Sequence, residues 1–120
     1  MTNLPQNPAL NKSIGVLFIR WNLYNRVAVA VAYFEEGNMV YMTISKSKML
    51  KLCSNFLPKE VDYGFISEYP LAMKKQKTNE AFWNEMAIQQ NGILELNKVS
   101  PIAIKLNRND FNKFAKLYLK

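Results

Sequence analysis

The sequence predicts a single α+β domain of 120 residues. Three observations support this fold class: apolar residues alternate along short runs in the first third of the chain, apolar residues at helical spacing follow them, and the C-terminus repeats both patterns. A chain of this length forms one hydrophobic core. Hydrophobic residues make up 49% and charged residues 21%, which is the composition of a folded protein.

The N-terminal segment 1–12 is expected to be a flexible leader, because Pro5 and Pro8 stand among polar residues. The segment lacks the basic and apolar regions of a signal peptide and the arginines of a transit peptide. The longest apolar run, Val27–Phe34, is much shorter than the roughly 20 residues that cross a bilayer as a helix. A single cysteine, Cys53, forms no internal disulfide. We therefore expect a cytoplasmic protein without a membrane partner, whose single domain spans 13–120.

Three antiparallel strands are predicted at the start of the domain. Ile14–Trp21 is an apolar run, Asn22–Asn25 forms a turn, and Arg26–Phe34 alternates as a strand does. Glu36-Gly37-Asn38 provides a tight turn into a third alternating run, Met39–Ile44. Short turns join antiparallel neighbours, so these runs form one sheet.

Alternation assigns the side chains of the second and third strands to faces. On the second strand we expect Val27, Val29, Val31 and Tyr33 on one face, and Ala28, Ala30, Ala32 and Phe34 on the other. The small alanines indicate a close neighbour. On the third strand we expect Val40, Met42 and Ile44 to pack on a helix, and Met39, Tyr41 and Thr43 to face away from it.

A capped helix is predicted directly after the third strand. Ser45 or Ser47 serves as its N-cap, and Pro58 ends it. Its apolar positions are three and four residues apart: Met49, Leu52, Cys53 and Phe56.

The C-terminal residues repeat this pattern of an alternating strand followed by a capped helix. Alternating Ile102, Ile104 and Leu106 precede Asn107 as a cap, Asp110 stands at the capping-box position, and a helical stripe follows: Phe111, Phe114, Ala115 and Tyr118. These residues match the first half at one constant offset. The match predicts a duplicated β-β-β(-β)-α unit, with pseudo-repeats at about 13–57 and 61–120 and antiparallel sheets packed against two helices. Any amphipathic strand followed by a capped helix gives a similar match.

Two interpretations of residues 78–90 remain open. Alternating Phe82, Met86 and Ile88 before the hairpin signal Gln90-Asn91-Gly92 favour strands, as the repeat requires. A cap at Thr78 or Asn79 and helical spacing of Phe82, Trp83 and Met86 favour a helix. We prefer strands. The repeat also places a strand at Val61–Tyr69, ended by Pro70, and an exposed loop at Lys74-Lys75-Gln76-Lys77.

The residue types present argue against catalysis. The chain contains no histidine, the usual acid–base residue near neutral pH and the commonest metal ligand. Cys53 at an apolar helix position indicates a core residue, and the four glycines form no phosphate-binding loop. The carboxylate pairs Glu35-Glu36 and Glu60 with Asp62 have no orienting partner. We expect no enzyme, no cofactor and no metal site.

The charge pattern favours nucleic-acid binding, because the net charge is +7 and the isoelectric point is about 9.6. Arg20, Trp21, Tyr24 and Arg26 cluster around the first hairpin, where guanidinium groups for phosphates lie beside rings for base stacking. Tyr33 and Tyr41 on neighbouring strands are expected either to provide a second stacking platform or to be part of the packing of the sheet. Basic residues near the first helix and in the predicted loop complete the candidate site: Lys46, Lys48, Lys74, Lys75 and Lys77. Lys51 follows in the same helix. Two other interpretations remain open: Trp21 packs in the core or in a subunit interface, and the lysines belong to ordinary solvated helix faces.

The strand-strand-strand-helix unit, with Leu106-Asn107 followed by Phe111 and Phe114, resembles the fold of Whirly proteins, of guide-RNA-binding mitochondrial proteins and of positive-cofactor-type transcription coactivators. This resemblance implies a curved antiparallel sheet that binds single-stranded DNA or RNA, with helices that mediate a homo-oligomer, a dimer or tetramer. The chain lacks the lysine-glycine-rich strand motif that Whirly proteins use for assembly, so higher assemblies do not carry over.

Three hypotheses follow for function. The first is non-catalytic binding of single-stranded nucleic acid, DNA or RNA. The second is a protein-interaction module or assembly subunit, in which Trp21, Tyr24 and Tyr33 form an apolar patch. The third is a carboxylate-only enzyme, in which side chains from one set of carboxylates converge in a pocket: Glu35, Glu36, Glu60 or Asp62.

Overall fold

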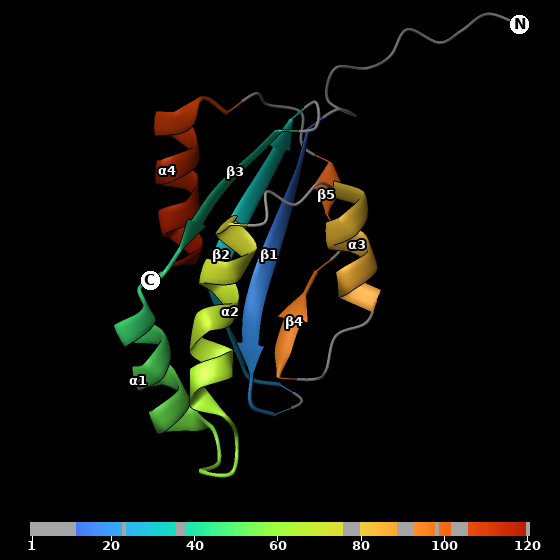
Figure 1. The fold of residues 1–120 in the computed structure, drawn as a ribbon. Coiled ribbons are helices and arrows are strands. Elements are labelled where there is room, and N and C mark those ends of the chain that lie inside the picture. The colour runs from blue at the N-terminus through green and yellow to red at the C-terminus, as the bar shows by residue number, and fades with distance from the viewer. Residues whose placement is uncertain are drawn as a thin grey trace, which may run out of the picture.

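The computed structural model describes residues 12–22, 24–35, 38–75, 80–88, 93–97, 99–101 and 106–119. The chain is α+β, as the sequence predicts (Figure 1). Its elements are β1 (Lys12–Arg20), β2 (Arg26–Glu35), β3 (Asn38–Thr43), α1 (Lys46–Phe56), α2 (Tyr63–Lys75), α3 (Glu80–Ile88), β4 (Leu94–Leu96), β5 (Ser100–Pro101) and α4 (Arg108–Tyr118).

The strands form one antiparallel sheet in the order β3-β2-β1-β4, and β5 pairs with the far end of β1. The predicted β1–β2–β3 meander is confirmed. Its first turn forms because the Asn22 side chain accepts hydrogen bonds of 2.9 Å from the backbone N–H groups of Tyr24 and Asn25. Residues 36 and 37 of the second predicted turn lie outside the described residues, between the paired Glu35 and Asn38.

Helices cover both faces of the sheet. One core cluster lies between the sheet and α1, α2 and α3, and the other lies between the sheet and α4. Four helices are described where two were expected. The largest buried side chain is Trp83 of α3, whose ring lies on Gly15 of β1 and whose indole N–H donates to the Asn97 carbonyl oxygen at 2.7 Å.

A β-bulge changes the predicted faces of β2. Leu17 pairs with Ala30 and Phe18 with Ala28, so Val29 is an extra residue in the ladder. Strict alternation therefore fails: Val27 and Val29 pack with Ala30, Ala32 and Phe34 in the cluster under α1–α3, whereas Ala28 packs with Val31 and Tyr33 in the cluster under α4.

The expectation that one side of β3 faces away from any helix is wrong. Met39 and Tyr41 pack in the cluster under α1–α3, and Val40 and Met42 pack in the cluster under α4. Ile44 was expected beside Val40 and Met42 but packs in the cluster under α1–α3.

The predicted helices after β3 and at the C-terminus are confirmed with their caps. The Ser45 hydroxyl accepts from the backbone N–H of Lys48 at 3.3 Å, and the Asn107 side chain accepts from that of Asp110 at 2.8 Å. Met49 and Cys53 of α1 are buried, as are Phe111 and Ala115 of α4. The strand expected at residues 102–105 lies outside the described residues.

A duplicated unit is not seen in the part of the chain that the structure describes. The strand expected at Val61–Tyr69 is wrong, because helix α2 occupies Tyr63–Lys75 with Pro70 inside it. Asp62 begins this helix by accepting from the Phe65 backbone N–H at 3.1 Å, and its buried residues follow helical spacing: Ile66, Ser67, Pro70 and Met73. Within 78–90 the preferred strand interpretation is also wrong, because α3 occupies Glu80–Ile88.

Candidate functional site

The end of the sheet that carries the β1–β2 turn holds two arginines around one carboxylate. Arg20 and Arg26 face each other across the two strands. Both guanidinium groups contact the carboxylate of Glu95 on β4, one at each oxygen. The Arg26 guanidinium also lies 4.0 Å from the centre of the Phe18 ring, which is a cation–π contact, and 3.5 Å from the Asn97 side-chain oxygen. We call this end of the molecule the hairpin end.

The strand register places Arg20, Arg26 and Glu95 on the same face of the sheet as α4. The helix covers this face farther from the β1–β2 turn. The cluster under α4 includes Ile14 and Val16, and Phe18 and Ala28 are half-buried at its border. Arg26 lies beyond them with 41% of its side chain exposed. The hairpin end of this face is therefore accessible to a ligand.

The hairpin end carries more positive than negative charge. Glu95 is 7% exposed and neutralises one of the two guanidinium groups. A carboxylate is found buried in a strand when neighbouring cations compensate its charge, and Arg20 and Arg26 both do so for Glu95. One positive charge is left over.

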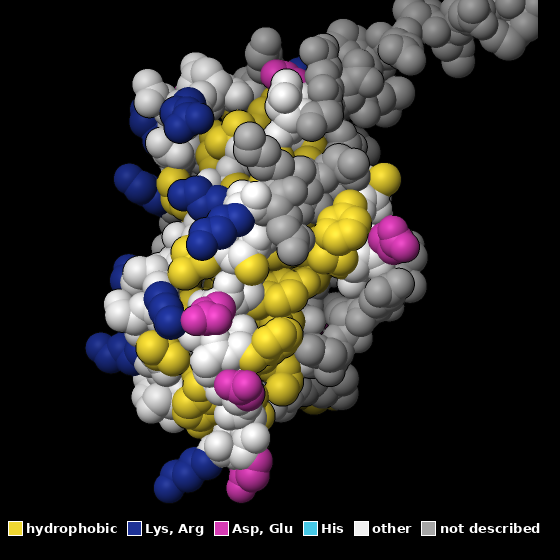
Figure 2. Space-filling model, in the orientation of Figure 1, with side chains coloured by type: hydrophobic (Ala, Val, Ile, Leu, Met, Phe, Trp, Pro, Cys, Tyr) yellow, Lys and Arg dark blue, Asp and Glu magenta, His cyan; other side chains and the backbone are white. Residues whose placement is uncertain are grey.

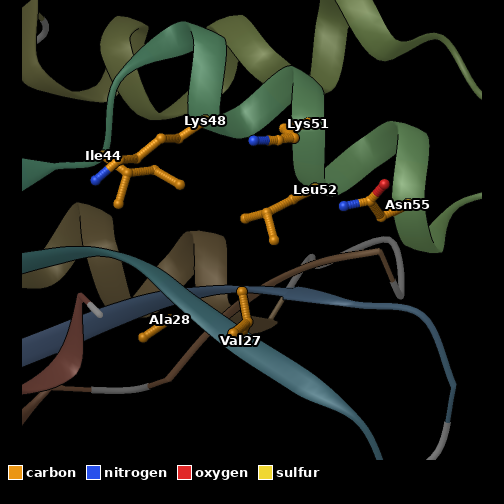
Figure 3. Close-up of a pocket in the computed structure, with 7 residues that line it drawn as sticks. All are labelled: Val27, Ala28, Ile44, Lys48, Lys51, Leu52 and Asn55. Atoms are coloured by element: carbon orange, nitrogen blue, oxygen red, sulfur yellow. The ribbon is translucent and has the colours of Figure 1, made fainter.

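A pocket opens beside the same stretch of β2. Ala30 pairs with Thr43, and the Ile44 backbone N–H donates to the Val29 carbonyl oxygen at 3.0 Å, after which the chain turns into α1. Within the described chain, no strand lies next to residues 26–28 on this side. Helix α1 stands across the gap and leaves a pocket of about 170 Å³ lined by Val27, Ala28, Ile44, Lys48, Lys51, Leu52 and Asn55 (Figure 3).

Two lysines of α1 add charge to this pocket. Lys48 and Lys51 are exposed and form no ion pair with a described residue, whereas Lys46 pairs with Glu68 at 3.1 Å. Figure 2 shows Lys and Arg side chains gathered over α4 and α1. We call Arg20, Arg26, Lys48 and Lys51 the hairpin-end cations. They come from three elements and surround the hairpin end of β2.

The two aromatic residues predicted at the hairpin, Tyr24 and Trp21, differ in their exposure to solvent. Tyr24 is 88% exposed. Trp21 is half-buried at the cluster under α1–α3, where its ring stacks on Phe56 at 4.3 Å between centroids and an interplanar angle of 14°. One face of the Trp21 ring is therefore covered within the molecule.

The stacking platform expected from Tyr33 and Tyr41 is wrong, because both side chains pack under helices on opposite faces. Tyr33 is 2% exposed; its hydroxyl donates to Glu35 at 3.1 Å and accepts from the Leu106 backbone N–H at 3.3 Å. Burial raises the pKa of Tyr33. The Tyr41 hydroxyl donates to the Pro70 carbonyl oxygen at 2.8 Å, and burial raises its pKa as well. The apolar patch expected from Trp21, Tyr24 and Tyr33 fails for the same reason.

The remaining predicted lysines do not belong to the hairpin end. Lys74 and Lys75 form the last turn of α2 instead of a loop. Figure 1 shows this helix running from the hairpin end of the molecule toward its middle, so its last turn lies away from the hairpin. Lys77 lies outside the described residues.

The sequence interpretation missed Phe18, Glu95 and Asn55. Glu95 carried a usable signal, since a lone carboxylate between Leu94 and Leu96 is unusual in an apolar strand and indicates a cationic partner. Phe18 and Asn55 carried no signal of their own.

The predicted carboxylate sites were also located. Glu35 accepts a hydrogen bond from Tyr33, Asp62 caps α2, and Glu36 lies outside the described residues. In the part of the chain that the structure describes, no group of three or more acidic or cysteine side chains is placed to hold a metal ion. None of the described helices is both long enough and apolar enough to cross a membrane.

Comparison with known proteins gives no relative: no family model matches the chain, and neither does any curated protein or solved structure.

Proposed function

We propose that the protein binds single-stranded nucleic acid without catalysis, and that the hairpin end is the binding surface. The observation that carries this proposal is that the four hairpin-end cations lie around the hairpin end of β2, and that among the described residues only one carboxylate, Glu95 of β4, pairs with any of them. A cluster of this kind attracts a polyanion, because each cation that meets a phosphate releases condensed counterions.

The exposed Tyr24 ring favours a single strand over a duplex. It lies at the tip of the hairpin and is almost fully exposed to solvent. A nucleobase that stacks on an aromatic ring contributes about 1–3 kcal/mol, and only an unpaired strand presents its base faces in this way. Phe18 is held under the Arg26 guanidinium and supports the cation rather than a base. Neither a cofactor nor a metal ion takes part in this binding.

The test is a fluorescence-anisotropy titration of labelled single-stranded DNA, single-stranded RNA and duplex over a series of salt concentrations. We compare the wild type with Lys48→Ala/Lys51→Ala. Each phosphate contact on a single strand contributes about 0.7 to the slope of log K against log salt, so loss of two contacts lowers the slope by about 1.4.

The matched control is Lys113→Ala/Lys116→Ala. These lysines are exposed on α4 and do not line the pocket, so the control removes the same charge from another surface. Equal slopes for the two double variants would show that net charge alone attracts the strand. Tighter binding of duplex than of single strands would contradict the proposal.

A second candidate function is supported by a separate surface. Phe65 of α2 is 56% exposed and Phe82 of α3 is 42% exposed. The Tyr69 ring contacts the Phe65 ring, and the Tyr69 hydroxyl lies 3.7 Å from the sulfur of Met86 on α3. Figure 2 shows the resulting hydrophobic band over α2 and α3. Exposed aromatic bands are typical of protein interfaces, and a second copy of the chain is the partner we propose.

Sedimentation equilibrium tests this second function. Phe65→Ser is expected to dissociate a wild-type dimer while the unfolding midpoint stays nearly constant, because most of the Phe65 side chain is already in solvent. A wild type that is monomeric at 100-micromolar concentration would exclude the band as a self-association surface.

A further inference from the structure

The pocket between α1 and β2 has the size of one aromatic ring. Its volume is about 170 Å³. An apolar protein cavity of about 150 Å³ is known to bind benzene, so a six-membered ring fits a space of this size. A pyrimidine base consists of one such ring, whereas a purine is a fused pair of rings.

The pocket walls suit a flat apolar ring on two sides. Val27 and Ala28 form the wall on β2, and Ile44 and Leu52 contribute the apolar part of the other side. Figure 3 shows Leu52 directed from α1 toward Val27, with the space between them open. Val27 and Ala28 are consecutive in β2 and therefore point to opposite sides of the sheet, so the pocket straddles the strand edge.

One polar group faces the same space. Figure 3 shows the Asn55 amide directed from the last turns of α1 toward the pocket. An amide offers both a hydrogen-bond donor and an acceptor, as does the Watson–Crick edge of a pyrimidine. Lys48 and Lys51 lie at the rim, where the phosphates on either side of an inserted nucleotide would pass.

We infer that this pocket receives one pyrimidine base of the bound strand, with Asn55 at its polar edge and Lys48 and Lys51 on the flanking phosphates. The inference rests on the proposed function. It adds that the protein prefers pyrimidine-rich strands and identifies the residues that set this preference.

The experiment compares oligothymidylate with oligoadenylate of equal length by anisotropy, for the wild type and two variants. Leu52→Trp fills the pocket with an indole ring, and Asn55→Leu removes the amide from an exposed position that folding tolerates. Each variant is expected to weaken oligothymidylate binding about tenfold and to leave oligoadenylate binding nearly unchanged. Ser54→Leu is the matched control, since Ser54 is exposed on the same helix and does not line the pocket.

The outcomes separate the inference from the proposed function. Adenine runs stack on themselves, so a thymidine preference that persists in Leu52→Trp and Asn55→Leu comes from the strand, and would overturn the pocket assignment while binding itself stands. Equal loss in Ser54→Leu would overturn it as well. If the wild type binds neither oligonucleotide, the proposed function fails, and the pocket is left as a site for an aromatic side chain of a protein partner.

Discussion

Glu95→Gln is expected to lower the stability of the protein and to raise its affinity for single-stranded nucleic acid. The carboxylate is buried and contacts both guanidinium groups. Glutamine has the same shape, and its carbonyl oxygen still accepts from one arginine, but the charge is lost. Arg20 and Arg26 then share one neutral acceptor.

The stability change is bounded by two known effects. Removing one partner of a fully buried ion pair costs about 3–5 kcal/mol, and a hydrogen bond to a charged group contributes about 1.5–3 kcal/mol. Because Arg26 is 41% exposed, water rehydrates its charge when the carboxylate is gone. We therefore expect the free energy of unfolding to fall by about 1.5–3 kcal/mol, as for loss of a hydrogen bond to a charged group. For a domain of this size 1 kcal/mol lowers the thermal midpoint by roughly 3–6 °C, so we expect a decrease of roughly 5–18 °C.

The affinity changes in the opposite direction, because a second guanidinium becomes free to meet a phosphate. One added contact makes the slope of log K against log salt steeper by about 0.7. Circular dichroism measures the midpoint, and anisotropy over a salt series measures the slope at a temperature where the variant is folded. An unchanged slope with weaker binding would refute the reasoning, because Glu95 would then position the arginines for the strand instead of competing with it.

Three further predictions concern the core. Gly15→Ala places a Cβ 2.5 Å from the Trp83 ring, and such overpacking costs about 1–3 kcal/mol, measured by urea denaturation; an unchanged midpoint would mean that Trp83 does not lie on β1. The folded protein keeps the Tyr41 hydroxyl neutral, since burial raises its pKa, whereas the unfolded chain ionises it from about pH 10. This contribution to stability is complete below that pH and is lost above it, so Tyr41→Phe should lose less stability between about pH 8 and pH 11 than the wild type; identical losses would contradict this. Cys53 is buried and its burial raises the pKa of the thiol, so alkylation should require unfolding, and rapid labelling of the native protein by iodoacetamide would contradict its placement in the core.

Local signals predicted the first half of the fold correctly. The β1–β2–β3 meander and α1 are specified by alternation, by Asn22 in the first turn and by the Ser45 cap, all of which lie within a few residues of the structure that they determine. In the second half the internal comparison misled the assignment. A proline is typical of a strand end, but the spacing of Ile66, Pro70 and Met73 fits a buried helical face.

Local signals likewise predicted only the part of the candidate site that lies close together in the sequence. Arg20 and Arg26 lie on either side of a short turn, so their proximity follows from the hairpin alone. Glu95 reaches them from 69 residues away from Arg26 in the chain, through a pairing of β1 with β4 that no local pattern encodes. Tyr33 and Tyr41 were placed on an open platform because strand alternation says nothing about which helices later cover each face.

The difference in length between β2 and β3 has a consequence for solubility. Where β2 extends past β3, its outer edge pairs with no other strand that the structure describes, and open strand edges nucleate association with strands of other molecules. Lysines beside an open edge oppose this, because a second copy would bring its own lysines into the same space. Lys48 and Lys51 are placed to protect the edge in this way. The pair therefore disfavours strand pairing of a second copy at this edge, while the same charges leave the edge open to an anionic ligand.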